Sequence, residues 1–232
     1  MREHRRCVAF DIDDTLYLER DYVRSGFAAV SQWIQRHLGI SGFLEAAWLQ
    51  FEAGRRGHIF EAVLRSRGFA YDAALIQQMV EIYRNHRPDI RLEPDASRFF
   101  NEQHSPAVRF AVVTDGPLAS QRRKAEALRL HEWAAPIILT ASRGPRFHKP
   151  SAEAFAEVQR TLALEGRACC YVADNPSKDF AGPKSLGWFT VRVRRPAGLH
   201  AALPSDQHVD VEIEDLDPLA RLVFDSFPGT AQ

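Results

Sequence analysis

Short apolar runs rich in β-branched and aromatic residues recur in the second half of the chain, with segments of helical spacing between them. The clearest runs are VRFAVVT (108–114), PIILT (136–140), ACCYVAD (168–174) and FTVRV (189–193), and CVAF (7–10) has the same character. The helical segments are SQRRKAEALRL (120–130), PSAEAFAEVQRTLAL (150–164) and KDFAGPKSLG (178–187). Nearly continuous apolar strands that alternate with helices predict an α/β fold with a doubly wound parallel sheet.

The segment from residue 18 to residue 91 has a different pattern. Its apolar residues recur every three or four positions, as in Val23, Phe27, Val30 and Ile34, and glycines separate the periodic stretches. This predicts four short helices inserted after the first strand. We therefore expect an α/β core formed by residues 1–17 and 92–232, with a small all-helical domain at 18–91.

Composition narrows the class of protein. Hydrophobic residues make up 45% of the 232 and charged residues 26%, which predicts a folded chain with a substantial core. Because 30 basic residues balance 30 acidic ones, neither nucleic acid nor a membrane is the expected partner. No apolar run approaches the roughly 18–20 residues that span a bilayer. The three cysteines show no disulfide spacing, and we expect a cytoplasmic protein, monomeric or homodimeric.

Polar residues with catalytic potential follow the predicted strands. In an open parallel sheet, ligands bind beyond the carboxyl ends of the strands. These positions hold Asp11, Asp13 and Asp14 after the first run, Thr114-Asp115-Gly116 after the second, His148-Lys149-Pro150 after the third, and Asp174, Asn175 and Asp179 after the fourth. The pattern predicts a cluster of carboxylates with one hydroxyl and one lysine at the same edge.

Carboxylates gathered at one edge need a cation. Oxygen ligands without a histidine and cysteine set favour a hard ion, most simply Mg²⁺. A lysine can hold a carboxylate ionised and bind a phosphoryl oxygen, and a carboxylate can attack phosphorus to form an aspartyl-phosphate. The chain has no zinc-type spacing, no phosphate-binding GxxxxGK[ST] loop and no GxSxG motif.

Four segments, in this order, resemble the motifs of the haloacid dehalogenase-like hydrolase superfamily. They are FDIDDTLY, VVTDG, HKPSAEAF and VADNPSKDF, and the resemblance covers nearly the whole chain. The segment 18–91 is similar to the C1-type helical cap of that superfamily. The resemblance implies an enzyme that is Mg²⁺-dependent and transfers phosphoryl groups.

The resemblance also implies roles for individual residues. Asp11 matches the nucleophile and Asp13 the general acid and base. Thr114 and Asp115 match the segment that binds the substrate phosphate, and Lys149 matches the lysine that stabilises charge on nucleophile and phosphate. The implied metal ligands are Asp11, the backbone carbonyl of Asp13, Asp174 and, in support, Asp179.

Asp13 favours phosphoryl transfer over dehalogenation. A phosphate ester leaves as an alkoxide and benefits from a proton donor, whereas a halide leaves unaided. We therefore predict a phosphomonoesterase acting on a small phosphorylated metabolite, a sugar phosphate or a nucleotide. A phosphomutase-like phosphotransferase is the main alternative; a dehalogenase or a non-catalytic binding module is less favoured.

The predicted helical insert contains one candidate for substrate selection. Arg55 and Arg56 lie between two glycines in the loop GRRG. Solvated surface arginines are the simplest interpretation, and a loop that grips an anionic group of the substrate is the alternative.

Overall fold

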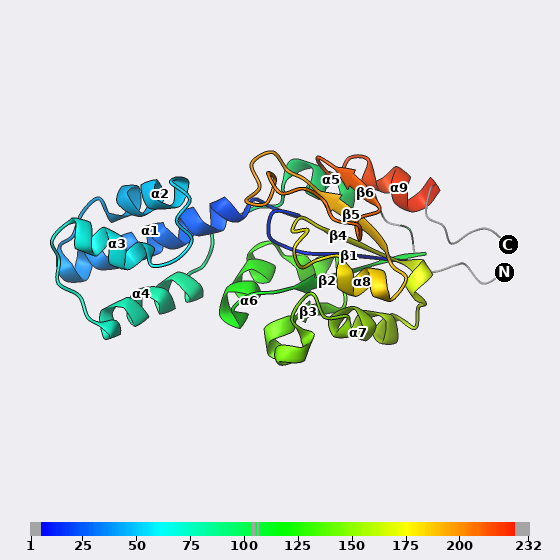
Figure 1. The fold of residues 1–232 in the computed structure, drawn as a ribbon, viewed down its shortest axis with the longest axis horizontal. Coiled ribbons are helices and arrows are strands. Elements are labelled where there is room, and N and C mark those ends of the chain that lie inside the picture. The colour runs from blue at the N-terminus through cyan, green and yellow to red at the C-terminus, as the bar shows by residue number, and fades with distance from the viewer. Residues whose placement is uncertain (1–5, 104, 106, 226–232) are drawn as a thin grey trace. The chain divides into compact units, whose positions relative to one another are not determined.

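The computed structural model describes residues 6–103, 105 and 107–225 (Figure 1). The chain forms two compact units: one joins the chain up to Glu19 with the chain from Arg91 onward, and the other is Arg20–Ile90. The first is the α/β unit and the second is the helical unit. Each is described separately.

The α/β unit is built on a parallel sheet. In the described residues its strands are β1 (Arg6–Phe10), β2 (Val108–Thr114), β3 (Ile137–Leu139), β4 (Cys169–Ala173), β5 (Phe189–Val193) and β6 (Val211–Ile213). They lie in the order β3-β2-β1-β4-β5-β6, and every pair is parallel. The predicted doubly wound α/β fold is confirmed. The sequence did not predict β6, where Glu212 interrupts an apolar pattern of only three residues.

Helices lie on both sides of this sheet (Figure 1). Those of the α/β unit are α5 (Pro94–Glu102), α6 (Leu118–Ala127), α7 (Glu153–Leu162), α8 (Ala181–Ser185) and α9 (Leu219–Asp225). The sequence predicted α6, α7 and α8 with slightly different ends, and missed α5 and α9. Pro94 at the start of α5 is a usual signal for a helix start, but the helix has only nine residues, too few to show a clear helical period in the sequence.

Alternation along the strands divides the core into two layers. Cys7 and Ala9 of β1 face the same side as Tyr171 of β4, where Phe155 of α7 packs against them. Phe10 faces the opposite side and contacts the rings of Phe99 and Phe100 of α5. The central strands are thus buried on both faces, which fixes the positions of their carboxyl ends.

The helical unit consists of α1 (Glu19–Leu38), which starts at the end of the α/β unit, α2 (Phe43–Glu52), α3 (Ile59–Ser66) and α4 (Ala73–Asn85). Four short helices were predicted, but α1 has 20 residues, and its buried stripe runs from Tyr22 to Ile34. Phe27 of this stripe contacts the rings of Phe51, Phe60 and Tyr83. Among the described residues, no helix combines the length and apolar character that a membrane crossing requires.

Candidate functional site

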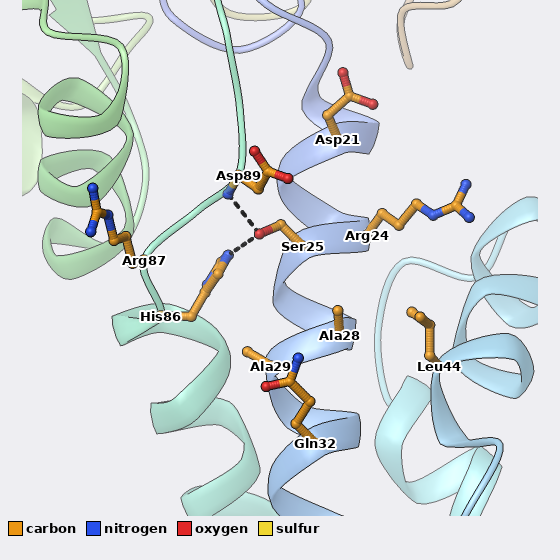
Figure 2. A pocket seen from close by; sticks show the side chains of 10 residues that line it. All are labelled: Asp21, Arg24, Ser25, Ala28, Ala29, Gln32, Leu44, His86, Arg87 and Asp89. Atoms are coloured by element: carbon orange, nitrogen blue, oxygen red, sulfur yellow. Dashed lines mark hydrogen bonds between the residues drawn. The ribbon is translucent and has the colours of Figure 1, made fainter.

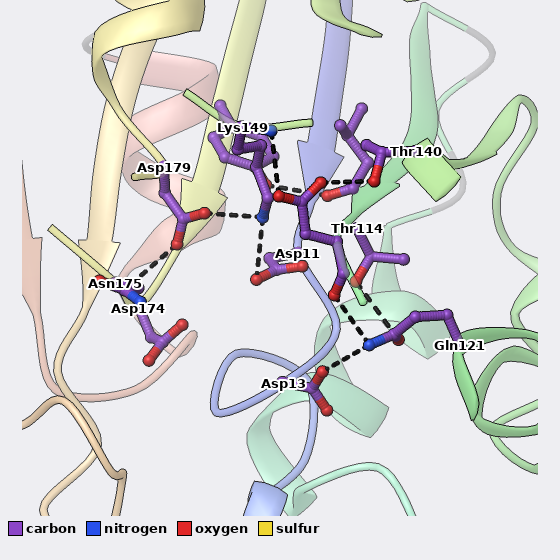
Figure 3. Close-up of polar contacts among 12 residues, drawn as sticks. Asp11, Asp13, Thr114, Gln121, Thr140, Lys149, Asp174, Asn175 and Asp179 are labelled. Carbon is purple, nitrogen blue, oxygen red and sulfur yellow. Dashed lines mark hydrogen bonds and ion pairs between the residues drawn. The ribbon is translucent and has the colours of Figure 1, made fainter. Parts of the chain in front are cut away.

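The ends of three neighbouring strands bring the predicted residues together (Figure 3). Asp11 directly follows β1, Thr114 ends β2 and Asp174 directly follows β4. The parallel register pairs Phe10 with Val112 on one side and with Val172 on the other, so the three strands end at the same level. Asp11, Thr114 and Asp174 are buried.

Lys149 lies at the centre of this group. Its ammonium nitrogen is 3.1 Å from Oδ2 of Asp11, 2.6 Å from Oδ1 of Asp179 and 3.0 Å from the hydroxyl of Tyr171. Burial alone would lower the pKa of Lys149, but the charges of Asp11 and Asp179 more than offset it and raise the pKa well above its usual value. The lysine is therefore a fixed positive charge beside the predicted nucleophile. Tyr171, which the sequence did not single out, supplies its third acceptor.

Asp115 holds the loop that carries Lys149. One carboxylate oxygen accepts a hydrogen bond from the hydroxyl of Thr140, and the other accepts one from the backbone N–H of Lys149 at 3.0 Å. The Asp115 side chain is thus engaged within the protein. A contribution of Asp115 to phosphate binding would come from its backbone N–H, because a carboxylate repels a phosphate.

A group of three carboxylates fits a divalent cation. Asp11, Asp174 and Asp179 each offer one oxygen, and these oxygens lie within 4.8 Å of one another. Burial raises the pKa of Asp174 to about 8, and it also raises the pKa of Asp179. Oδ1 of Asp11 is buried and has no hydrogen-bond partner among the described residues. A cation would supply that partner and allow all three groups to ionise.

The Asp13 carboxylate lies outside this group and has its own partners. Lys124 donates to both of its oxygens, at 2.6 and 2.8 Å, and Gln121 donates to Oδ2 at 2.9 Å. The Tyr17 hydroxyl also donates to it. Burial alone would raise the pKa of Asp13, but the Lys124 ammonium group more than offsets this and lowers it. These partners engage the side chain, and the predicted metal ligand of Asp13 is its backbone carbonyl.

Gln121 connects the Asp13 carboxylate to the end of β2. Its amide accepts a hydrogen bond from the Thr114 hydroxyl at 3.4 Å and donates to the backbone carbonyl of Asp115 at 2.9 Å (Figure 3). Gly116 makes room for it, because a Cβ at this position would lie 2.6 Å from the Gln121 amide nitrogen. Neither Gln121 nor Lys124 was predicted, since the carboxylate that both contact, Asp13, lies 108 and 111 positions away in the sequence.

His200 is another group that the sequence did not reveal. Its Nδ1 is 3.0 Å from Oδ2 of Asp174, and this hydrogen bond raises the pKa of His200. His200 belongs to the segment that follows β5, and its place after a strand was the one sequence signal that could have identified it.

Asp14 is the third aspartate after β1. Its carboxylate accepts hydrogen bonds from the backbone N–H groups of Glu19 and Leu199.

The two arginines of the GRRG loop lie in the helical unit and behave differently. Nε of Arg55 donates to the Gln50 side chain at 2.9 Å, and Arg55 lines a hollow of about 720 Å³. Arg56 donates to the backbone carbonyl of Phe51 and lies 4.2 Å from the centre of its ring. Arg56 is therefore tied to the end of α2, and Arg55 is the more available of the two for an anion.

A second hollow of about 530 Å³ lies in the helical unit between α1 and the segment that follows α4 (Figure 2). Ser25 at its wall accepts a hydrogen bond from the backbone N–H of Asp89 at 2.9 Å and contacts Nε2 of His86 at 3.1 Å. Arg24 and Arg87 also line it. The hollow is lined by charged side chains of both signs and by apolar ones such as Leu44.

Comparisons with known proteins agree with this geometry. A family model described as haloacid dehalogenase-like hydrolase matches residues 5–187. Among curated proteins, the glyceraldehyde 3-phosphate phosphatase of Methanocaldococcus jannaschii is 26% identical over 223 residues, covering 93% of this chain and 96% of that protein. The protein of the same name from Methanopyrus kandleri is 24% identical over 199 residues, covering 82% and 84%.

Solved structures share the fold. The magnesium-bound HAD-hydrolase YfnB of Bacillus subtilis superimposes with a TM-score of 0.67 at 20% identity, covering 95% of this chain and 99% of that one. The L-2-haloacid dehalogenase of Xanthobacter autotrophicus gives 0.60 at 21% identity, covering 94% and 98%. Solved structures with this fold include one titled a HAD phosphatase, from Thermococcus onnurineus, as well as this dehalogenase, so the fold alone does not distinguish the two activities. The match over most of the chain, together with the strand-end carboxylates, shows that this chain belongs to the haloacid dehalogenase-like hydrolase family.

Proposed function

We propose that this enzyme is a Mg²⁺-dependent phosphomonoesterase that forms an aspartyl-phosphate on Asp11. The observation that carries the proposal is the environment of Asp11. One of its oxygens is paired with Lys149. The other is buried at a group of three carboxylates and has no hydrogen-bond partner in the described part of the chain. This arrangement suits a nucleophile that works beside a cation and an anionic substrate.

Asp11, Asp174 and Asp179, with the backbone carbonyl of Asp13, would hold Mg²⁺. The ion would neutralise the carboxylates and the negative charge of the transferring phosphoryl group. Lys149 would add a second positive charge on the same side. The Thr114 hydroxyl and the backbone N–H groups after it would orient the phosphoryl oxygens, since this segment adjoins Asp11 at the sheet edge.

The chemistry would proceed in two steps. In the first, the Asp11 carboxylate attacks phosphorus, the bond from phosphorus to the ester oxygen breaks, and Asp13 gives that oxygen a proton. In the second, water attacks the phosphorus, the bond to Asp11 breaks, and Asp13 takes a proton from the water. The presence of Asp13 supports phosphoryl transfer rather than dehalogenation, because a departing halide needs no proton.

The relatives suggest the class of substrate. Both curated relatives are named as phosphatases of glyceraldehyde 3-phosphate. A small phosphorylated sugar is therefore the first substrate to test, with nucleoside monophosphates as the second class. We propose that the helical unit selects the leaving group and that Arg55 contacts an anionic or hydroxyl-bearing part of it, with Arg56 in a supporting place.

The test is phosphate release from a panel of phosphate esters with Mg²⁺, headed by glyceraldehyde 3-phosphate. We expect wild type to release phosphate, Asp11→Asn to release none, and Asp217→Asn to match wild type. Asp217 is the control because its carboxylate is exposed and paired with Arg98 on the surface. Transfer of phosphate between sugars without net release would favour the phosphotransferase, and activity that survives in Asp11→Asn would refute the mechanism.

A further inference from the structure

The Asp13 carboxylate is held by two side chains from one helix. Lys124 and Gln121 lie three residues apart on α6, and together they donate three hydrogen bonds to the two oxygens of Asp13. The Lys124 side chain is only 4% exposed, and that of Asp13 is 17% exposed. The carboxylate is thus fixed in position from the side of α6.

Stability gives a weak reason for this arrangement. A buried ion pair recovers little more than the cost of removing both charges from water, and apolar replacements of similar volume are often as stable. A buried ammonium group directed at the one carboxylate expected to exchange protons is better explained by what it does to that carboxylate. Because Lys124 contacts both oxygens of Asp13, it holds the carboxylate in one fixed orientation.

A carboxylate held in one orientation suits the second step of the proposed reaction, in which it accepts a proton from water. We propose that Lys124, assisted by Gln121, is a positioning residue that holds Asp13 as the general base for hydrolysis of phosphorylated Asp11. The inference rests on the proposed function and adds residues that none of the sequence motifs contains. It concerns Asp13 only through the geometry of its hydrogen bonds.

Hydrolysis of phosphorylated Asp11 forms one bond to phosphorus and breaks another. The oxygen of water forms a bond to phosphorus, and the bond between phosphorus and Asp11 breaks, returning its electron pair to the Asp11 carboxylate. The proton of the water passes to Asp13, and inorganic phosphate leaves. Asp13 then carries the proton that the next leaving group takes, so the step also prepares the first step of the following cycle.

Loss of Lys124 should therefore separate the two steps. Without the ammonium group, the carboxylate is less firmly held where it can accept the proton of the attacking water, so hydrolysis slows. p-Nitrophenolate leaves phosphorus without a proton donor, so formation of the phosphorylated enzyme from p-nitrophenyl phosphate does not need a positioned Asp13 and continues. The phosphorylated enzyme should accumulate, which a general loss of structure would not cause.

The experiment is rapid-quench kinetics of the full-length protein with Mg²⁺ and p-nitrophenyl phosphate, comparing wild type with Lys124→Met. We expect the variant to release one equivalent of p-nitrophenol per site in a burst. Steady turnover should then be lower by about 10–100-fold, part of the ~10²–10⁴-fold that a positioned acid or base contributes. Mass spectrometry of the quenched variant should find the phosphoryl group on the peptide that contains Asp11.

Three further variants complete the design. Lys124→Arg keeps the positive charge and should recover part of the steady turnover. Lys184→Met makes the same chemical change in a lysine paired with Asp210 at the surface and should behave as wild type. Lys124→Gln keeps a hydrogen-bond donor without the charge and should also show the burst, which preserves the test if Lys124→Met does not fold.

The outcomes distinguish this inference from the proposed function. Variants of Lys124 that turn over as fast as wild type, or that lose burst and steady turnover in equal proportion, would overturn the positioning role and leave the phosphatase intact. Absence of phosphate release from wild type, or phosphorylation that survives in Asp11→Asn, would instead refute the proposed function.

Discussion

Replacing Arg195 by methionine should destabilise the α/β unit far more than the loss of a surface arginine. The Arg195 guanidinium forms two hydrogen bonds with the carboxylate of Asp95, at 3.1 and 2.8 Å, and two with the backbone carbonyl of Thr15, at 3.0 and 2.7 Å. The side chains of Arg195 and Asp95 are only 6% and 7% exposed. Thr15 belongs to the loop that carries Asp11 and Asp13.

The magnitude follows from what the substitution leaves behind. Methionine can fill the space of the arginine stem, but it removes the cation paired with the Asp95 carboxylate. The carboxylate then keeps backbone N–H donors, such as that of Leu216, without a positive charge from residue 195. Breaking a buried pair by removing one member costs about 3–5 kcal/mol. For a chain of this size, 1 kcal/mol lowers the melting temperature by roughly 2–4 °C, so we expect a decrease of about 6–20 °C.

The assay is thermal and urea unfolding of Arg195→Met beside Arg98→Met. Arg98 makes a similar two-point contact with Asp217, at 2.8 and 2.9 Å, but both side chains are more than half exposed. Burial is therefore the main difference between the two pairs, and Arg98→Met should unfold close to wild type. Equal losses of stability in the two variants would show that burial does not make the Arg195–Asp95 pair more important than the surface pair.

Acid provides a second check of this pair. Burial alone would raise the pKa of Asp95, but the hydrogen bonds from Arg195 and Leu216 more than offset it and lower the pKa. A lowered pKa contributes stability that is complete above the unfolded value of about 3.9 and is lost as the pH falls further. The stability difference between wild type and Asp95→Asn should stay constant near neutral pH and shrink below about pH 4.

Three other outcomes are expected. Calorimetry should show that Asp174→Asn weakens Mg²⁺ binding by at least about 10–100-fold. Losing a group that only supports a metal ligand already costs that much affinity, and Asp174 is a proposed ligand itself. An unchanged affinity would show that Asp174 is not a ligand. Gly182→Ala should cost about 1–3 kcal/mol in urea unfolding, because its Cβ would lie 2.7 Å from the carbonyl oxygen of Pro150, whereas Gly57→Ala, with open space around it, should be neutral. The three buried cysteines should resist a thiol reagent until the protein unfolds, and fast labelling of the native protein would contradict their burial.

Sequence patterns predicted the features that depend on local periodicity. The central strands are continuous apolar runs, and Asp11, Thr114 and Asp174 lie at their carboxyl ends, so topology alone brings them together. Strand β6 escaped notice because Glu212 interrupts its three residues, and helix α9 because seven residues are too few to establish a period.

Contacts between distant segments could not be predicted in the same way. Lys124 reaches Asp13 across 111 positions, and Arg195 reaches Asp95 across 100. A lysine within a helical pattern is usually exposed, and nothing local marks the one that a folded sheet edge will bury. The same holds for Tyr171, whose hydroxyl reaches Lys149 from within an apolar strand.

The most direct test of the account is to trap the phosphorylated enzyme. Wild type and Asp11→Asn are mixed with Mg²⁺ and a phosphate ester that wild type hydrolyses, quenched in acid, and digested for mass spectrometry. The account predicts a phosphoryl group on the peptide containing Asp11 in wild type, and neither phosphorylation nor phosphate release in Asp11→Asn. Phosphate release by Asp11→Asn at the rate of wild type would contradict it.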